Sequence, residues 1–235
     1  TVAELPMPAL NYRNEEFWAG VLARGISANG EIIYGTSWEN WDFGMLYWVN
    51  NGANTEKPKW VGEDVREVWE ETMKNSDGTE YTTHLVNGLI CQAQLTKISP
   101  NGKWIASSYR TETPAEDRLS IVTTQTAAFY NTETETTTIV SDYGESVGVH
   151  VTDDGIGFIG IGTLGISSGA VYDLNTGTDL GSTQDWVYDN YGIIIPAGYI
   201  NYVSADGRFV LGTKAESSAG GVNFINWYIA PPRAK

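Results

Sequence analysis

Two tryptophans and their polar neighbours, in the run Trp38-Glu39-Asn40-Trp41-Asp42, are the residues of this chain best suited to bind a ligand. Indole rings stack on sugar rings, and the amide of Asn40 and the carboxylate of Asp42 add hydrogen-bonding groups beside them. Large aromatic side chains exposed on a protein usually contact something. The pattern predicts a ligand-facing rim at Trp38, Asn40, Trp41 and Asp42; the alternative is that the rings pack in the core between structural units.

Catalytic and metal-binding signatures are absent from the sequence. His84 and His150 do not have the spacing of metal ligands, and no Gly-x-Ser-x-Gly, His-Glu-x-x-His or phosphate-binding glycine loop occurs. Adjacent acids such as Glu70-Glu71 point apart on a strand, whereas a glycosidase needs two carboxylates from separate loops. We therefore expect no catalytic residue, no metal and no cofactor.

The composition indicates a folded, β-rich protein. Among 235 residues there are 26 glycines, 9 tryptophans and 13 tyrosines, and the net charge is −15. Such a charge repels phosphate backbones, so nucleic acid is not an expected partner. The single cysteine, Cys91, lies in an apolar run and is expected to be a buried, inert thiol. No apolar stretch approaches the roughly 18 residues of a membrane span.

A short phrase that recurs four times organises the chain. Its copies are Ser27-Ala28-Asn29-Gly30, Ser99-Pro100-Asn101-Gly102, Thr152-Asp153-Asp154-Gly155 and Ser204-Ala205-Asp206-Gly207. Runs typical of strands lie on both sides of each copy, and Asn-Gly and Asp-Gly are strong hairpin turns. We expect Gly30, Gly102, Gly155 and Gly207 to adopt positive φ and to serve structure rather than function.

The repeats predict an all-β fold, a β-propeller, with four blades of four short antiparallel strands each. The whole chain, residues 1–235, is expected to form this single domain. The last repeat supplies only three candidate strands, which end at Ile229. Residues 1–5 are β-like and precede the first repeat, so they are expected to pair with the last blade as its missing outer strand. The ring would then close by pairing of the chain termini.

The first repeat is about 20 residues longer than the others, and the excess predicts an insertion at about residues 53–88. Val65, Val68, Trp69 and Met73 recur at helical spacing among acidic residues, which predicts a short amphipathic helix over 63–74. The alternative is a hairpin that turns at Asn75-Ser76-Asp77-Gly78, because the residues that follow are typical of a strand.

The run Ile98-Ser99-Pro100-Asn101-Gly102-Lys103-Trp104-Ile105-Ala106 resembles the SPDGKxIA phrase of TolB-like and other WD40-like bacterial β-propellers. The first and fourth copies, which begin at Ser27 and Ser204, are similar to repeats of secreted bacterial propellers. The resemblance implies an extracytoplasmic bacterial protein: periplasmic, on the cell surface or secreted. It says little about activity, because such propellers serve as scaffolds, binding modules and enzyme domains.

The function expected from the sequence is that of a non-enzymatic module that binds a protein or a glycan. Two alternatives stay open. One is a carbohydrate-active enzyme domain whose catalytic carboxylates lie on rim loops, and the other is a purely structural domain of a larger chain.

Overall fold

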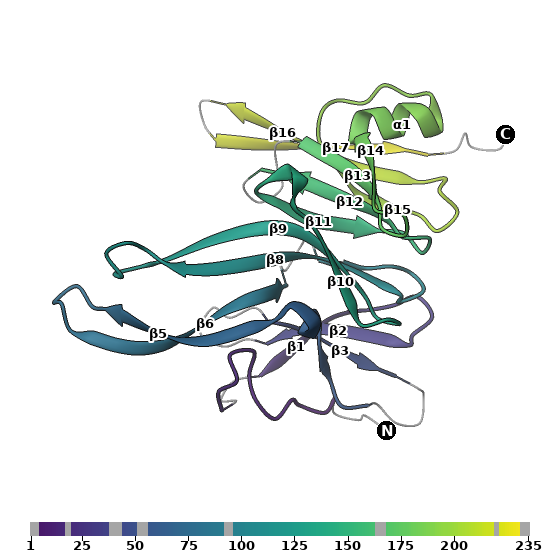
Figure 1. Cartoon of the computed structure of the whole chain (residues 1–235). Helices are drawn as coiled ribbons and strands as arrows, with labels where there is room; N and C mark the ends of the chain where they lie inside the picture. The colour runs from purple at the N-terminus through teal and green to yellow at the C-terminus, as the bar shows by residue number, and fades with distance from the viewer. Residues whose placement is uncertain are drawn as a thin grey trace.

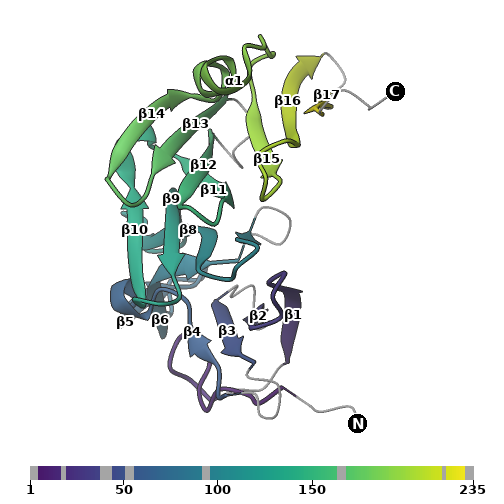
Figure 2. The same ribbon diagram turned by 90° about the vertical axis from the view of Figure 1, so that its right-hand side faces the viewer.

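Four small antiparallel sheets form a four-bladed β-propeller, as the repeats predict, and Figure 1 shows them from the side, with the N-terminal sheet at the bottom and the C-terminal sheet at the top. This computed structural model describes residues 5–16, 20–37, 44–50, 56–91, 96–162, 168–218 and 221–230. Figure 2 shows the sheets in chain order along a curve, with β1 at one end and β17 at the other.

The first sheet has the order β1 (Val21–Ile26), β2 (Ile32–Ser37), β3 (Met45–Val49), β4 (Lys59–Trp60). The second has the order β10 (Thr136–Val140), β9 (Ile121–Asn131), β8 (Trp104–Pro114), β6 (Glu80–Ile90), β5 (Glu67–Lys74), and β7 (Lys97–Ile98) also pairs with β8. The third has the order β11 (Ser146–Val151), β12 (Ile156–Ile161), β13 (Ser168–Asp173), β14 (Thr178–Ser182). The fourth has the order β15 (Tyr199–Val203), β16 (Val210–Ser218), β17 (Gly221–Ile229). The helices among the described residues are the 3₁₀ turns η1 (Glu63–Val65) and η2 (Ser141–Tyr143) and the α-helix α1 (Thr183–Tyr191).

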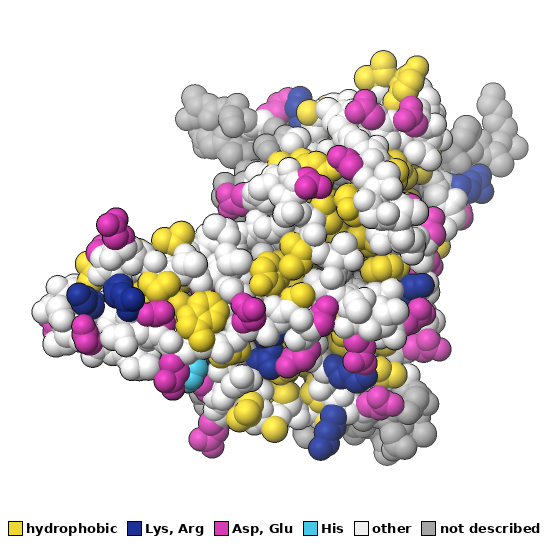
Figure 3. All heavy atoms as spheres, in the orientation of Figure 1, with side chains coloured by type: hydrophobic (Ala, Val, Ile, Leu, Met, Phe, Trp, Pro, Cys, Tyr) yellow, Lys and Arg dark blue, Asp and Glu magenta, His cyan; other side chains and the backbone are white. Residues whose placement is uncertain are grey.

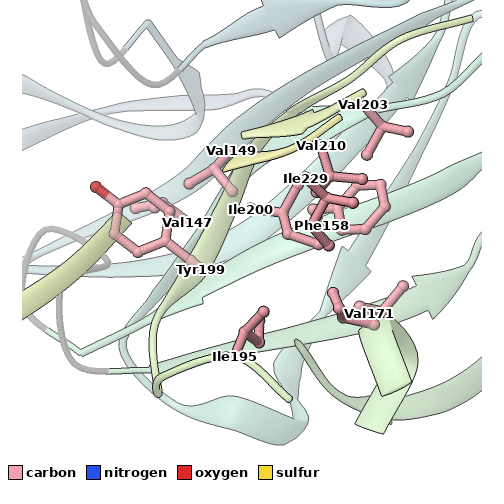
Figure 4. Packing of buried hydrophobic residues seen from close by; sticks show 11 residues of the cluster. Val147, Val149, Phe158, Val171, Ile195, Tyr199, Ile200, Val203, Val210 and Ile229 are labelled. Atoms are coloured by element: carbon pink, nitrogen blue, oxygen red, sulfur yellow. The ribbon is translucent and has the colours of Figure 1, made fainter. Parts of the chain in front are cut away.

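A separate hydrophobic cluster is buried between the first and second sheets, between the second and third, and between the third and fourth. Alternate residues of a strand face opposite sides, so Ile105 packs toward the first sheet while Trp104 and Ala106 pack toward the third. The cluster between the third and fourth sheets contains Phe158, Ile200 and nine further buried residues (Figure 4). Burial on both faces explains the apolar character of the middle strands. Cys91 lies in the cluster between the first two sheets, and burial raises the pKa of its thiol, as expected of an inert cysteine.

The four repeated turns share one hydrogen-bond pattern. In each, the hydroxyl of the first residue, Ser or Thr, contacts the Asn or Asp side chain two residues later. The same hydroxyl accepts a hydrogen bond from the backbone N–H of the first or second residue after the turn glycine. Ser99 shows the pattern: its Oγ lies 2.8 Å from Asn101 Oδ1 and 3.0 Å from Trp104 N. The predicted positive φ is confirmed at all four glycines: 77° at Gly30, 80° at Gly102, 82° at Gly155 and 66° at Gly207.

The helix predicted over 63–74 is wrong. Only Glu63–Val65 forms a turn of 3₁₀ helix, and Glu67–Lys74 is strand β5, which pairs with β6 along its whole length. The alternative hairpin is confirmed: Gly78 has φ 86°, and its N–H donates to Asn75 O at 2.9 Å. The turn residues and the β-branched and aromatic residues of both strands favour a hairpin more strongly than the helical spacing of the apolar positions favours a helix.

The predicted closure of the ring by the chain termini lies largely outside the described residues, because Thr1–Glu4 are not among them. Within the described part of the chain, β17 pairs with β16 alone. The pairing of residues 1–5 with the last blade therefore stays a prediction.

A buried ion-pair cluster anchors the N-terminal segment to the second sheet. Glu112, which is 3% exposed, receives two hydrogen bonds of 3.1 Å from Arg13. The Nη2 atom of Arg110 lies 3.0 Å from Glu112 Oε1, and the N–H of Val86 donates to Oε2 at 3.0 Å. These contacts connect residue 13 to β6 and to the long hairpin β8–β9, which projects with β5–β6 as the arm in Figure 3.

Candidate functional site

The ligand-facing rim predicted from the sequence lies outside the described residues, since Trp38, Asn40, Trp41 and Asp42 are not among them. The structure instead points to a cavity of about 370 Å³ on the side of the ring where the repeated turns lie. Its lining residues are Pro100, Thr152, Asp153, Asp154, Ile156, Trp186, Asn190, Tyr191, Val203, Ser204, Ala205 and Gly207. The second, third and fourth copies of the repeated phrase thus contribute to one site.

The spacing of the turns explains where the cavity opens. The first and second turns are bridged by Ala28 N, which donates to Pro100 O at 2.7 Å. The second and third are bridged by Asn101 N, which donates to Asp153 Oδ1 at 2.8 Å. No hydrogen bond joins the third turn (152–155) to the fourth (204–207), both of which the structure describes, and the cavity lies between them.

Helix α1 supplies the aromatic wall. Ser182 is its N-cap: the Ser182 side chain accepts from Asp185 N at 3.1 Å and contacts Asp185 Oδ2 at 2.6 Å. Gly192, with φ 65°, ends the helix in the left-handed conformation. Because both ends are capped, this helix of 9 residues holds Trp186, Asn190 and Tyr191 in place at the cavity.

The rings of the wall are fixed by contacts behind them. The Trp186 ring packs edge-on against Phe158 of β12 at 5.0 Å and against Tyr191 at 5.8 Å. The Tyr191 hydroxyl donates to Gly207 O at 2.6 Å, so the wall is tied to the fourth turn. Burial raises the pKa of Tyr191, which keeps the phenol neutral. The wall is therefore preorganised for stacking against a ligand.

Carboxylates give the cavity its charge. Asp153 and Asp154 line it, and no Lys, Arg or His is found among the described residues of the lining. Asp206 lies in the fourth turn, where hydrogen bonds from Ser204 Oγ and from Arg208 N lower its pKa. The Asp206 carboxylate thus stays ionised at neutral pH, beside the exposed Arg208.

His150 lies behind the cavity, between the third and fourth sheets. It is 2% exposed, and its Nε2 accepts a hydrogen bond of 3.0 Å from the N–H of Val203, a lining residue. The ring stacks on Phe158 with centroids 5.7 Å apart. Burial lowers the pKa of His150 to about 4. The imidazole is consequently neutral and couples the two sheets that form the cavity.

Metal ligands do not gather in the described ranges: no group of three or more His, Cys, Asp or Glu side chains there could hold an ion. Among the same residues, no helix has the length and apolar character needed to cross a membrane.

No family model matches this sequence, and no curated protein matches it either. Among solved structures, the chain is similar to the crystal structure of the tricorn protease, with 10% identity and a TM-score of 0.25. The match covers 88% of this chain and 25% of the other, so the chain spans a quarter of the length of that structure.

This site was not predicted from the sequence, which indicated a structural role for the glycines of the repeated turns. One signal was available: Ser182 three residues before Asp185 is an N-cap pattern, and Gly192 is a helix stop. The convergence of the turns had no signal in the sequence, because it follows from the curvature of the ring.

Proposed function

We propose that this β-propeller is a non-enzymatic binding module and that the cavity at the repeated turns holds a protein or glycan partner. The observation that carries the proposal is the preorganised wall of Trp186 and Tyr191 beside hydrogen-bonding groups in a cavity of about 370 Å³. That volume is within the range of ligand sites, which combine apolar walls with a few placed polar groups. The resemblance of the repeated phrase to TolB-like propellers supports an extracytoplasmic bacterial location.

Titration with a panel of glycans and short peptides, followed by NMR of the tryptophan indole N–H groups, tests this proposal. A ligand of this cavity should shift the Trp186 signal, and Trp186→Leu should weaken its binding by at least about tenfold, because the stacking surface is lost. Trp69→Leu is the matched control, since Trp69 is a half-buried indole of β5 in another sheet. Equal effects of the two substitutions, or no ligand in either panel, would contradict the proposal.

A further inference from the structure

We infer that the ligand of this cavity is the positively charged side chain of an arginine in a partner polypeptide. The inference rests on the proposed function and specifies the partner class. Its basis is the combination of carboxylates with a fixed aromatic wall inside one cavity, which suits a guanidinium group better than a neutral or an anionic ligand.

The carboxylates have acceptor atoms to spare. Asp153 is held through Oδ1 by the N–H of Asn101, and Asp154 through Oδ1 by the hydroxyl of Thr152. No described residue donates a hydrogen bond to Oδ2 of either side chain. A guanidinium has five N–H donors in a planar fork, so it has enough donors for a hydrogen bond to each free oxygen.

The aromatic wall adds a surface for the plane of the same group. A guanidinium stacks on indole and phenol rings, and the negative face of the ring attracts the cation. Trp186 is half-buried, and its orientation is set by Phe158 and Tyr191. Little conformational entropy is lost when such a fixed ring binds a ligand.

The charge distribution disfavours other ligands. A phosphate or an acidic sugar would meet Asp153 and Asp154, and the part of the lining that the structure describes offers no basic residue to neutralise it. The charge of the whole chain, −15, also favours the approach of a cationic partner over an anionic one. A neutral glycan would use the aromatic wall but would leave the carboxylate oxygens without a charged partner.

A peptide array compares arginine-containing sequences with the same sequences carrying citrulline, the neutral isostere, and with a neutral glycan panel. Affinities of the best pairs are then measured by fluorescence anisotropy. We expect each citrulline exchange to weaken binding by about tenfold or more, and Asp153→Asn with Asp154→Asn to weaken the arginine peptides similarly. Asp117→Asn is the matched control, because this acid of the β8–β9 turn also caps a backbone N–H, that of Leu119.

Arginine and citrulline peptides that bind equally would overturn the inference, as would an effect of Asp117→Asn equal to that of Asp153→Asn. A neutral glycan that binds in a Trp186-dependent way while arginine peptides do not would overturn the arginine inference and leave the proposed function standing. If neither class binds, both are wrong.

Discussion

Acidification should destabilise this protein through His150. The imidazole is buried between the third and fourth sheets and accepts a hydrogen bond from Val203 N. Protonation would place a charge in an apolar environment and would remove the acceptor of that N–H. The pKa is accordingly about 4 in the folded chain, against 6.5 for an unperturbed histidine.

The direction of the effect follows from the two pKa values. Between pH 6.5 and pH 4 the unfolded chain binds a proton that the folded chain does not, so the free energy of unfolding falls as the pH falls. The contribution of His150 is fully present above pH 6.5 and is lost as the pH falls toward 4. Linkage gives a loss of about 2 kcal/mol between pH 7 and pH 5 and about 3 kcal/mol by pH 4.

Urea denaturation at a series of pH values, for the wild type and for His150→Gln, measures this loss. Glutamine can keep an acceptor near Val203 N but does not titrate, so subtracting the two curves removes the contribution of the carboxylates. The difference should decline by about 2 kcal/mol from pH 7 to pH 5. Parallel curves for the wild type and His150→Gln would refute the reasoning.

Three further predictions concern the turns, the buried ion pair and the aromatic run. Gly30→Ala should lower the free energy of unfolding by about 1 kcal/mol through its positive φ alone. Gly102→Ala should lower it further, because the new Cβ would lie 2.8 Å from Ile32 Cγ1. Equal losses for the two variants in urea denaturation would contradict this. Glu112→Gln should lower the free energy of unfolding by about 3 kcal/mol, because Arg110 keeps a buried charge. Glu71→Gln, which removes a more exposed partner of Arg118, should lower it by less than about 1 kcal/mol. Thermal melts that rank the two variants otherwise would argue against a stabilising role of the buried ion-pair cluster. Trp41→Ala tests the position expected from the sequence for this aromatic run: a rim position predicts a nearly unchanged melting temperature, and a melting temperature several degrees lower would favour the core position instead.

The sheets of this protein could be predicted because their signals are local. The phrase that begins at Ser99 specifies a tight turn, a glycine at positive φ and two flanking strands, and its recurrence specifies blades. The same local reasoning failed for Glu67–Lys74, where two patterns competed. The helical spacing of Val65, Val68 and Met73 was weaker than the pairing offered by the turn at Gly78 and by the strand after it.

The candidate site could not be predicted, because it depends on packing between blades. Asp153 and Ser204 are far apart in the sequence, and they line one cavity only because neighbouring turns are drawn together around the ring. Trp186 reaches this cavity because a short capped helix follows β14. The sequence of a single repeat shows neither the approach of the turns to one another nor the position of Trp186 at the cavity.

Hydrogen exchange measured by mass spectrometry, with and without a bound arginine peptide, locates the binding site. Binding should slow exchange in the turns at residues 99–102, 152–155 and 204–207 and in the peptide that covers α1 (Thr183–Tyr191). The β5–β6 hairpin should exchange at an unchanged rate. Protection confined to the run from Trp38 to Asp42, with all three turns and α1 unchanged, would contradict the assignment of the site.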